Sequence, residues 1–291
     1  MNYEGPVIRP PSEANSLILQ VTFGCSHNRC TFCPAYKGRR FRIKGIEEIR
    51  HDIDEASAYD PGTRRVFLAD GDALIIPQPK LLEILDHLNR RFPALQRIGT
   101  YANVKGILRK SITDLKELKA RKLGIIYLGI ESGDEETLAA VHKGTTCDGI
   151  AEASARVKDA GIKLSVTVLL GVGGRERSLM HARETGRLLT RVQPDYVGAL
   201  TLMLVPGAPL YDAALSGSFI LPFPLELVRE LKIMIEESDL NHCLFFSNHA
   251  SNYFPLRARL PRDKEASLQL LDTVLNQPDR AVLTPEHLRA L

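Results

Sequence analysis

The sequence has 291 residues and lacks any uninterrupted run of about 18 apolar residues, the length a helix needs to cross a membrane. We therefore expect no membrane span. The first residues, Met1 to Pro6, carry neither the basic stretch nor the apolar core of a secretory signal. No internal repeat or low-complexity segment is evident. These absences are typical of a globular protein. Its length is enough for one large domain or two small ones.

Cysteine is also scarce, and its distribution is uneven. Only five cysteines occur, and three of them fall within nine residues. A disulfide framework spreads its cysteines differently, so we expect a reducing, cytoplasmic environment. The formal net charge of +3 is weak evidence for any particular partner.

The three clustered cysteines form the clearest motif. Cys25, Cys30 and Cys33 have the spacing Cys-x4-Cys-x2-Cys and follow an apolar segment, Leu17–Phe23, that predicts a strand. Thiolates that converge from one loop are typical ligands of a soft metal or an iron–sulfur cluster. Three thiolates can hold three irons of a [4Fe–4S] cube and leave the fourth iron open to a ligand. We therefore expect a cluster here.

A structural zinc site is the alternative, because His27 lies between the cysteines and could act as a fourth ligand. Structural zinc sites usually draw two pairs of ligands from separate segments. Cys147 and Cys243 are isolated and supply no second pair. We expect Cys243 to be a buried structural thiol.

Six apolar segments alternate with helical patterns along the first 210 residues. Near-continuous apolar strands are typical of a parallel sheet that is buried on both faces. Right-handed crossovers would curl such a series into a barrel or an open part-barrel. The predicted strands are Ser16–Phe23, Arg65–Ala69, Gln96–Tyr101, Gly124–Ile130, Lys163–Leu170 and Asp195–Leu204. The predicted helices between them are Glu47–Tyr59, Gln78–Phe92, Ser111–Arg121 (with Ser111 as N-cap), Asp134–Val141, Asp148–Ala160 and Ser178–Val192.

The pattern changes after residue 210. We expect a lead-in over residues 1–15, a core over 16–210 and a helical extension over 211–291 that packs on the core. The extension's predicted helices are Leu225–Asp239, Lys264–Leu275 and Pro285–Leu291, the last with Thr284 as N-cap. An irregular polar-aromatic segment, Phe245–Phe254, separates the first two. Its His249 and Asn252 are candidate substrate contacts, with hydrogen-bonded packing of the segment as the alternative.

Four unusual loops follow predicted strands. They are the cysteine loop, Asp70–Ala73, Glu131–Gly133 and Gly171–Gly174. In a parallel α/β barrel the loops after the strands carry the chemistry. The coincidence of the four loops is stronger evidence than any single motif.

Over Ser16–Leu210 these motifs together resemble the radical S-adenosylmethionine (radical SAM) superfamily. The superfamily's usual loop is Cys-x3-Cys-x2-Cys with an aromatic residue before the last cysteine; here the first gap is one residue longer and Phe32 fits the aromatic position. The resemblance implies a (β/α)6 partial TIM barrel, and the sequence pattern adds the helical C-terminal extension to it. It also implies a [4Fe–4S] cluster on Cys25, Cys30 and Cys33, with Phe32 packing against the adenine of S-adenosylmethionine.

The other loops resemble the superfamily's cofactor-binding segments. Asp70-Gly71-Asp72 stands where the superfamily has Gly-Gly-Glu, which binds the methionine amino group. Glu131 and Ser132 resemble a segment whose acid meets the ribose or methionine part. Gly171 lies in a segment that resembles the one supporting adenine by backbone contacts, and Arg177 could pair with a carboxylate.

The stretch from Gly129 to Thr137, with Lys143 and Gly144, most resembles the branch of anaerobic coproporphyrinogen dehydrogenases, methylthiotransferases and Elongator catalytic subunits. The resemblance implies cleavage of S-adenosylmethionine to methionine and a 5′-deoxyadenosyl radical, which abstracts hydrogen from an unidentified substrate. It further implies an electron donor such as flavodoxin or ferredoxin.

Alternatives within the class are action on RNA or on a tetrapyrrole. The alternative from another class is a non-catalytic, zinc-stabilised binding protein. Two basic groups could attract an anionic substrate or RNA, but we favour a solvated surface, and no recognisable RNA-binding module accompanies them. These groups are Arg39, Arg40, Arg42 and Lys44, and Arg257, Arg259, Arg262 and Lys264.

Overall fold

The computed structural model describes residues 1, 3–5, 7–277 and 283–290, and the chain forms two compact units. The first unit consists of Met1–Asn28, Ala35–Leu128 and Glu152–Leu164. The second consists of Arg29–Pro34, Gly129–Ala151 and Ser165–Leu291. The cysteine loop is therefore divided, with Cys25 in the first unit and Cys30 and Cys33 in the second.

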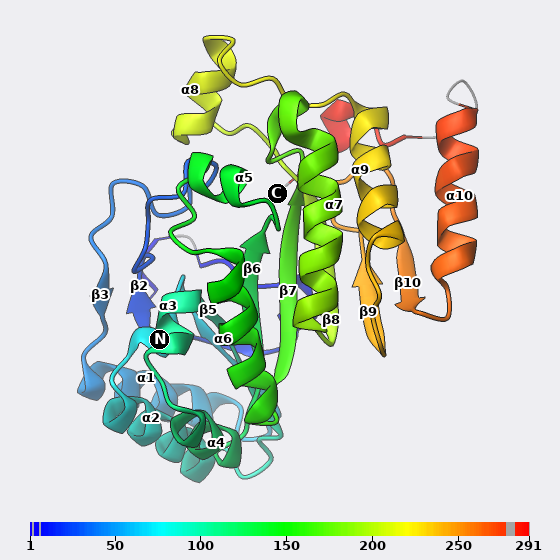
Figure 1. Ribbon diagram of the computed structural model, residues 1–291. Helices are drawn as coiled ribbons and strands as arrows, with labels where there is room; N and C mark the ends of the chain where they lie inside the picture. Colours follow the sequence, from blue (N-terminus) through cyan, green and yellow to red (C-terminus); the bar gives the residue numbers. More distant parts are fainter. Residues whose placement is uncertain (2, 6, 278–282, 291) are drawn as a thin grey trace. The chain divides into compact units, whose positions relative to one another are not determined.

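The first unit is built on parallel strands in the order β1-β4-β5-β6. Its strands are β1 (Leu17–Gln20), β4 (Arg65–Ala69), β5 (Arg97–Ala102) and β6 (Leu123–Glu131, which ends in the second unit), with a small antiparallel pair of β2 (Thr22–Phe23) and β3 (Arg42–Ile43). Its helices are α1 (Ile46–Tyr59), α2 (Gln78–Arg91), α3 (Val104–Leu108) and α4 (Ile112–Ala120), with 3-10 turns at Pro11–Glu13 and Ala73–Ile75. Helix α2 packs against both α1 and α4 (Figure 1).

Local sequence explains these helices. In α2 the buried residues Leu81, Ile84, Leu85 and Leu88 follow the spacing of one helical face. At the start of α4, Ser111 accepts a hydrogen bond from Asp114 N, and the Asp114 carboxylate accepts one from Ser111 N. This capping box confirms the predicted N-cap.

The second unit continues with strands in the order β7-β8-β9-β10, of which only the β9–β10 pair is antiparallel. The strands are β7 (Lys163–Leu170), β8 (Tyr196–Thr201), β9 (Cys243–Phe246) and β10 (Arg257–Leu260). The helices are α5 (Glu135–Ala140), α6 (Cys147–Asp159, shared between the units), α7 (Gly174–Val192), α8 (Pro209–Leu215), α9 (Pro224–Glu236) and α10 (Lys264–Asn276), with a 3-10 turn at Glu286–Leu288. Helices α7, α9 and α10 lie side by side (Figure 1).

The predicted α/β class is confirmed, since the strands of each unit are mostly parallel, and a strand is found in each of the six predicted segments, the first of which, Ser16–Phe23, is divided into β1 and β2. The extension predicted as helical differs in one respect, because it also contributes β9 and β10. Strand β9 extends the parallel sheet by pairing with β8. A four-residue strand leaves too short a pattern to be recognised in sequence.

The prediction of a last helix over Pro285–Leu291 is wrong for the described residues, because only Glu286–Leu288 forms a single 3-10 turn. Leu291 lies outside the described residues. Thr284 does not cap this turn, and its backbone N–H donates to Tyr253 O instead. The buried Arg289 side chain donates to Ser251 O and Leu202 O, which holds the chain extended beyond the turn. Throughout the described ranges, we find no helix with the length and apolarity to span a membrane.

Candidate functional site

The first half of the cysteine loop is held by the segment Asp70-Gly71-Asp72, which directly follows β4. Gly24 N donates to Asp70 Oδ2 over 3.0 Å, and Gly71 N donates to Gly24 O over 3.1 Å. Ser26 Oγ donates to Asp72 Oδ2 over 2.8 Å. Three consecutive residues therefore fix the loop on both sides of Cys25.

Gly71 allows this approach because it has no side chain. A Cβ atom at position 71 would lie 2.7 Å from Cys25 Cβ and 3.0 Å from Cys25 Cα. Such distances are far inside van der Waals contact. Glycine at 71 is thus required for Cys25 to lie against the backbone of this segment.

The two carboxylates of the segment are buried. Asp70 adopts a φ of 73°, a strained backbone conformation for a residue with a side chain, and also accepts a hydrogen bond from Gln20. Burial raises the pKa of Asp70, opposed by hydrogen bonds from Gln20 and Gly24. Burial also raises the pKa of Asp72 to about 6, opposed by hydrogen bonds from Ser26 and Asn103. Contact of either acid with the cofactor's amino group stays a prediction.

Asn103 belongs to the same hydrogen-bonded cluster as Ser26 and Asp72, and the sequence analysis did not identify it as a site residue. It follows β5 directly and caps α3, with Oδ1 accepting from Gly106 N over 2.7 Å. Its Nδ2 donates to Ser26 Oγ over 2.8 Å. The available signal was its position, since it is a polar residue immediately after a buried strand.

The second half of the cysteine loop is held within the second unit. Thr31 N donates to Val141 O over 3.0 Å, and Leu210 N donates to Thr31 O over 2.9 Å. These bonds fix the residue that follows Cys30 to the end of α5 and the start of α8. The neighbouring Phe32 is half-buried.

The five cysteines divide by exposure. Cys25, Cys30 and Cys33 are partly exposed, whereas Cys147 and Cys243 are buried. Burial raises the pKa of the Cys243 thiol to about 12, which agrees with a structural role. Among the residues described, no three His, Cys, Asp or Glu side chains are arranged to hold a metal ion. The ligand assignment therefore depends on donor chemistry: three partly exposed thiols within nine residues suit an iron–sulfur cluster.

Glu131 ends β6 in a left-handed backbone conformation, with a φ of 63°. Its Oε1 accepts a hydrogen bond from Lys143 Nζ over 2.8 Å, and the two side chains are only 10% and 14% exposed. The ion pair gives the Glu131 carboxylate a partner at the end of an apolar strand, where a buried carboxylate without one is costly.

The residues after Glu131 are held by one face of α7. Ser132 Oγ lies 2.7 Å from His181 Nδ1, and Gly133 N donates to Thr185 Oγ1 over 2.9 Å. Arg177 forms two hydrogen bonds to the Asp134 carboxylate, of 2.7 and 2.8 Å. The three α7 residues are spaced by four, so they share a face.

Arg177 was expected to pair with a carboxylate, and in this structure that carboxylate belongs to Asp134. Burial alone would raise the pKa of Asp134, but hydrogen bonds from Arg177 and Thr137 outweigh it and lower the pKa to about 2. A contact between Arg177 and the cofactor stays a prediction.

Gly171 begins the predicted adenine segment with a φ of 83°, which favours glycine. A Cβ atom there would lie 2.9 Å from Leu227 Cδ2. Gly171 N donates to Glu230 Oε2 over 2.7 Å. Burial raises the pKa of Glu230 to about 8, against opposing hydrogen bonds from Ser178 and Gly171.

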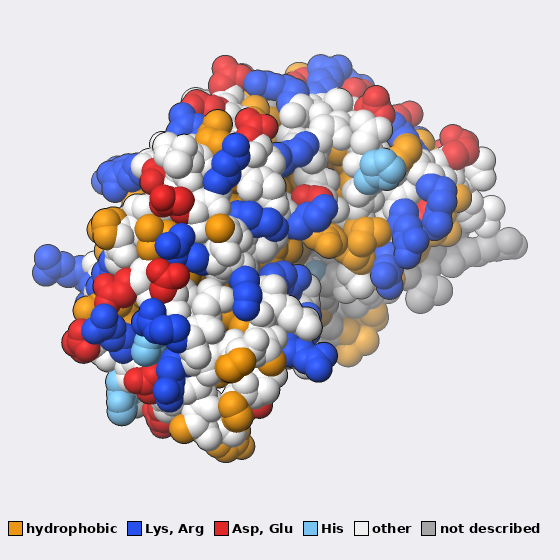
Figure 2. Space-filling model, turned by 90° about the horizontal axis from the view of Figure 1, so that it is seen from below, with side chains coloured by type: hydrophobic (Ala, Val, Ile, Leu, Met, Phe, Trp, Pro, Cys, Tyr) orange, Lys and Arg blue, Asp and Glu red, His pale blue; other side chains and the backbone are white. Residues whose placement is uncertain are grey.

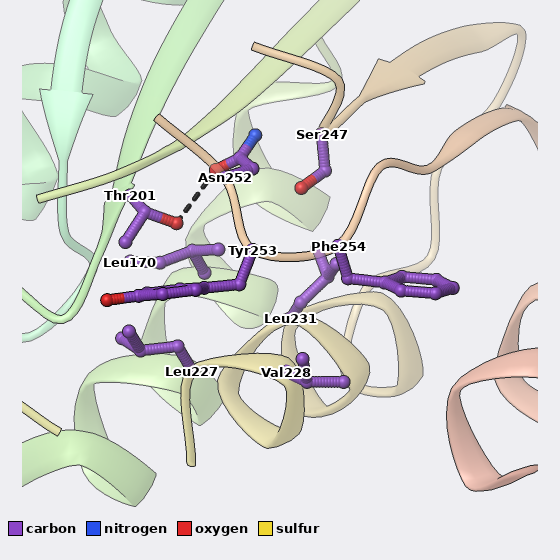
Figure 3. A pocket seen from close by; sticks show the side chains of 9 residues that line it. All are labelled: Leu170, Thr201, Leu227, Val228, Leu231, Ser247, Asn252, Tyr253 and Phe254. Carbon is purple, nitrogen blue, oxygen red and sulfur yellow. Dashed lines mark hydrogen bonds between the residues drawn. The ribbon is translucent and has the colours of Figure 1, made fainter. Parts of the chain in front are cut away.

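The two candidate substrate contacts have internal partners. Asn252 is buried, and its Oδ1 accepts from Thr201 Oγ1 over 2.8 Å (Figure 3). Its Nδ2 donates to Ala199 O, also over 2.8 Å. His249 Nδ1 lies 2.9 Å from Ser251 Oγ, and burial lowers the pKa of His249. These bonds match the alternative of hydrogen-bonded packing, and substrate contact by either residue stays a prediction.

The cavity beside Asn252 has a volume of about 10 Å³, roughly the room for one water molecule. Apolar side chains from α9 and from the end of β7 line it together with Tyr253 and Phe254 (Figure 3). This cavity is too small for an organic substrate.

Several of the basic residues singled out in sequence are already engaged. Lys44 is fully buried and pairs with Asp52, and Arg42 pairs with Glu4. Arg262 pairs with Asp263, while Lys264 donates to backbone carbonyls. On the face seen in Figure 2, Lys and Arg side chains are interspersed with Asp and Glu. This mixed pattern is typical of a solvated surface.

Comparison with known proteins adds a family and a fold. The family model for the Radical SAM superfamily matches residues 19–189. A tRNA-2-methylthio-N(6)-dimethylallyladenosine synthase of Dehalococcoides mccartyi is 30% identical over 196 residues, which cover 65% of this chain and 45% of that protein. A protein of Methanocaldococcus jannaschii, provisionally named a methylthiotransferase, is 24% identical over 180 residues, which cover 57% of this chain and 38% of that protein. This chain thus spans less than half the length of either relative.

Among solved structures, coproporphyrinogen III oxidase from Escherichia coli, described as a radical SAM enzyme, matches with a TM-score of 0.58 at 13% identity. The match covers 84% of this chain and 56% of that one. At this identity the likeness shows the fold, and it agrees with the predicted partial TIM barrel.

Proposed function

This chain belongs to the radical SAM superfamily, and we propose that it binds a [4Fe–4S] cluster and cleaves S-adenosylmethionine to start radical chemistry on a second substrate. Cys25, Cys30 and Cys33 hold the cluster. When bound, the cluster supplies the electron that cleaves the cofactor's sulfonium bond into methionine and a 5′-deoxyadenosyl radical. The chain's own residues fix the ligand loop, orient the cofactor and exclude water.

The observation that carries this proposal is the attachment of the loop around Cys25. Hydrogen bonds from Gly24, Ser26 and Gly71 leave the segment that bears the thiol little freedom. A ligand loop fixed before the metal binds loses less conformational entropy when the metal arrives. That arrangement suits a resident cofactor better than a chance cluster of thiols.

The cofactor-binding roles follow from the loops after the strands. Glu131 offers a carboxylate to the ribose or methionine part, and the hydrogen bond from Lys143 holds that carboxylate in place. Phe32 packs against the adenine, and Gly171 supports the adenine by its backbone. Ser132 and Arg177 position this region through His181 and Asp134. Asp70, Gly71 and Asp72 hold the cysteine loop and contact the methionine amino group.

The second candidate function is the modification of RNA. It is favoured by one observation, the 30% identity to a protein named as a tRNA methylthio-synthase. A tetrapyrrole substrate has in its favour the likeness of fold to coproporphyrinogen III oxidase and 27% identity over 136 residues to a protein named bacteriochlorophyllide d C-8(2)-methyltransferase. We further propose a small reductant such as flavodoxin or ferredoxin, because the reaction needs an electron at low potential. We also propose a cytoplasmic location, because the cysteines do not form a disulfide framework.

Metal analysis of anaerobically purified protein tests the class. We expect brown protein with about four irons and four sulfides per chain, the composition of one [4Fe–4S] cluster. Colourless protein with stoichiometric zinc would contradict the proposal and support the zinc-stabilised binding protein.

A further inference from the structure

Two backbone segments of the second unit, Ser132–Asp134 after β6 and Gly171–Gly174 after β7, are connected by buried side chains of α7 and α9. The connecting residues are His181 on α7 and Glu230 on α9, and neither is exposed. The buried faces of both helices are mostly apolar, with residues such as Leu188, Leu189, Leu231 and Met234, and α7 also buries the small hydroxyl residues Ser178 and Thr185. An ionisable pair in such an interface costs stability that apolar side chains would not cost.

On the α7 side, the hydrogen bonds define how His181 contacts Ser132. Asp134 N donates to Ser132 Oγ over 3.0 Å, so the hydroxyl hydrogen can be donated to His181 Nδ1 at 2.7 Å. In the neutral imidazole the ring proton is then on Nε2. Burial lowers the pKa of His181 to about 4, opposed by Asp134 and the Leu169 carbonyl, so the ring is neutral near pH 7.

On the α9 side, Glu230 connects His181 to the second segment. Its Oε2 accepts from Gly171 N over 2.7 Å and lies 3.8 Å from His181 Nε2. Gly171 is in a left-handed conformation and begins the tight turn that leads into α7. The carboxyl group therefore holds one amide of this turn and lies in contact with the imidazole that holds the other segment, although no hydrogen bond joins the two side chains.

We propose that His181 and Glu230 are positioning residues that set the spacing between Ser132–Asp134 and Gly171–Gly174, and thereby prepare both segments to bind S-adenosylmethionine. This inference rests on the proposed function of those segments. It explains why the α7–α9 interface keeps two costly polar side chains, since apolar packing cannot fix individual backbone amides at defined positions.

The test compares Glu230→Ala with Glu230→Gln in the full chain, because glutamine keeps an oxygen to accept from Gly171 N. Met234→Ala is the matched control, since Met234 is equally buried on α9. Hydrogen–deuterium exchange of the peptide containing Gly171 reports on the segment without any cofactor. Equilibrium dialysis then gives the Kd of S-adenosylmethionine for the iron-loaded protein.

We expect Glu230→Ala to exchange at Gly171 at least about tenfold faster and to bind S-adenosylmethionine about tenfold more weakly, as for one lost buried hydrogen bond. Glu230→Gln should stay near wild type in both measurements. Met234→Ala should lower the Tm without either change.

Unchanged exchange in Glu230→Ala, or the same loss of affinity in Met234→Ala, would overturn the inference alone. A wild-type, iron-loaded protein that binds no S-adenosylmethionine would overturn the proposed function and the inference together.

Discussion

Ser26 Oγ and Asp72 Oδ2 lie 2.8 Å apart and join the cysteine loop to the segment that follows β4. Asp72 is fully buried, and Asn103 contacts both residues. Replacing Asp72 with alanine leaves the Ser26 hydroxyl without this acceptor. We expect the free energy of unfolding to fall by roughly 1–3 kcal/mol and iron incorporation to fall with it.

Denaturant titration and iron analysis of the reconstituted protein measure both effects. Asp72→Asn is the control, because asparagine keeps an oxygen that can accept from Ser26. Equal losses in the two variants would mean that charge, and not the hydrogen bond, is what the loop needs.

Gly71→Ala tests the close approach of backbone to Cys25. The added Cβ would lie 2.7 Å from Cys25 Cβ, so one of the two segments must move. We expect a loss of roughly 1–3 kcal/mol of stability, as for overpacking, together with reduced iron content. Gly45→Ala is the matched control, since a Cβ at position 45 has its nearest neighbours at 3.9 Å. Normal iron loading in Gly71→Ala would refute the requirement for glycine.

Glu131→Gln tests the proposed cofactor contact. Glutamine keeps the shape and an oxygen beside Lys143 but removes the charge. We expect the cluster to form normally while S-adenosylmethionine binds more weakly by about 1.5–3 kcal/mol, or roughly 10- to 150-fold. Equilibrium dialysis measures this, with Glu152→Ala as the control, because Glu152 is an exposed side chain on α6. An unchanged Kd would remove Glu131 from the cofactor site.

The raised pKa of Glu230 predicts a pH dependence of stability. Its folded-state pKa of about 8 exceeds the ordinary value of 4.5, so its contribution to stability is greatest at low pH and is lost as pH rises towards 8. The titratable groups facing it are His181 on α7 and Glu226 on α9. Burial lowers the pKa of His181 from 6.5 to about 4, so the contribution of His181 makes stability rise with pH between these two values. Above pH 6.5 it no longer changes with pH.

Between pH 6.5 and 8 the Glu230 effect is therefore separate from that of His181. We expect the Tm of the wild type to fall over this interval relative to that of Glu230→Gln, which cannot ionise at this position. Parallel Tm profiles for the two proteins would show that Glu230 does not titrate there.

Much of the fold could be predicted from the sequence because its signals are local. The apolar segments Arg65–Ala69 and Lys163–Leu170 coincide with β4 and β7, and the Ser111 cap has its partner three residues away. The four unusual loops were recognised for the same reason, since each directly follows an apolar strand. Strands β9 and β10 were missed because their pairing partners, not their four residues, make them strands.

The supporting residues of the candidate site could not be predicted, because their contacts are distant in sequence. His181 contacts Ser132 across 49 positions, and Glu230 contacts Gly171 across 59. On a helix, an isolated histidine or glutamate is typical of a solvated face. His181 and Glu230 are buried where α7 packs against α9. Asn103 was missed for a related reason, because its role depends on Ser26, 77 positions earlier.

The most direct test of the account is an anaerobic assay for 5′-deoxyadenosine, with reconstituted protein, a strong reductant and S-adenosylmethionine. We predict that the wild-type protein releases 5′-deoxyadenosine and methionine, and that cell extract containing the substrate increases the rate. Cys30→Ala should carry little iron and release neither product. An iron-loaded wild type that leaves S-adenosylmethionine intact, or a Cys30→Ala variant that still cleaves it, would contradict the account.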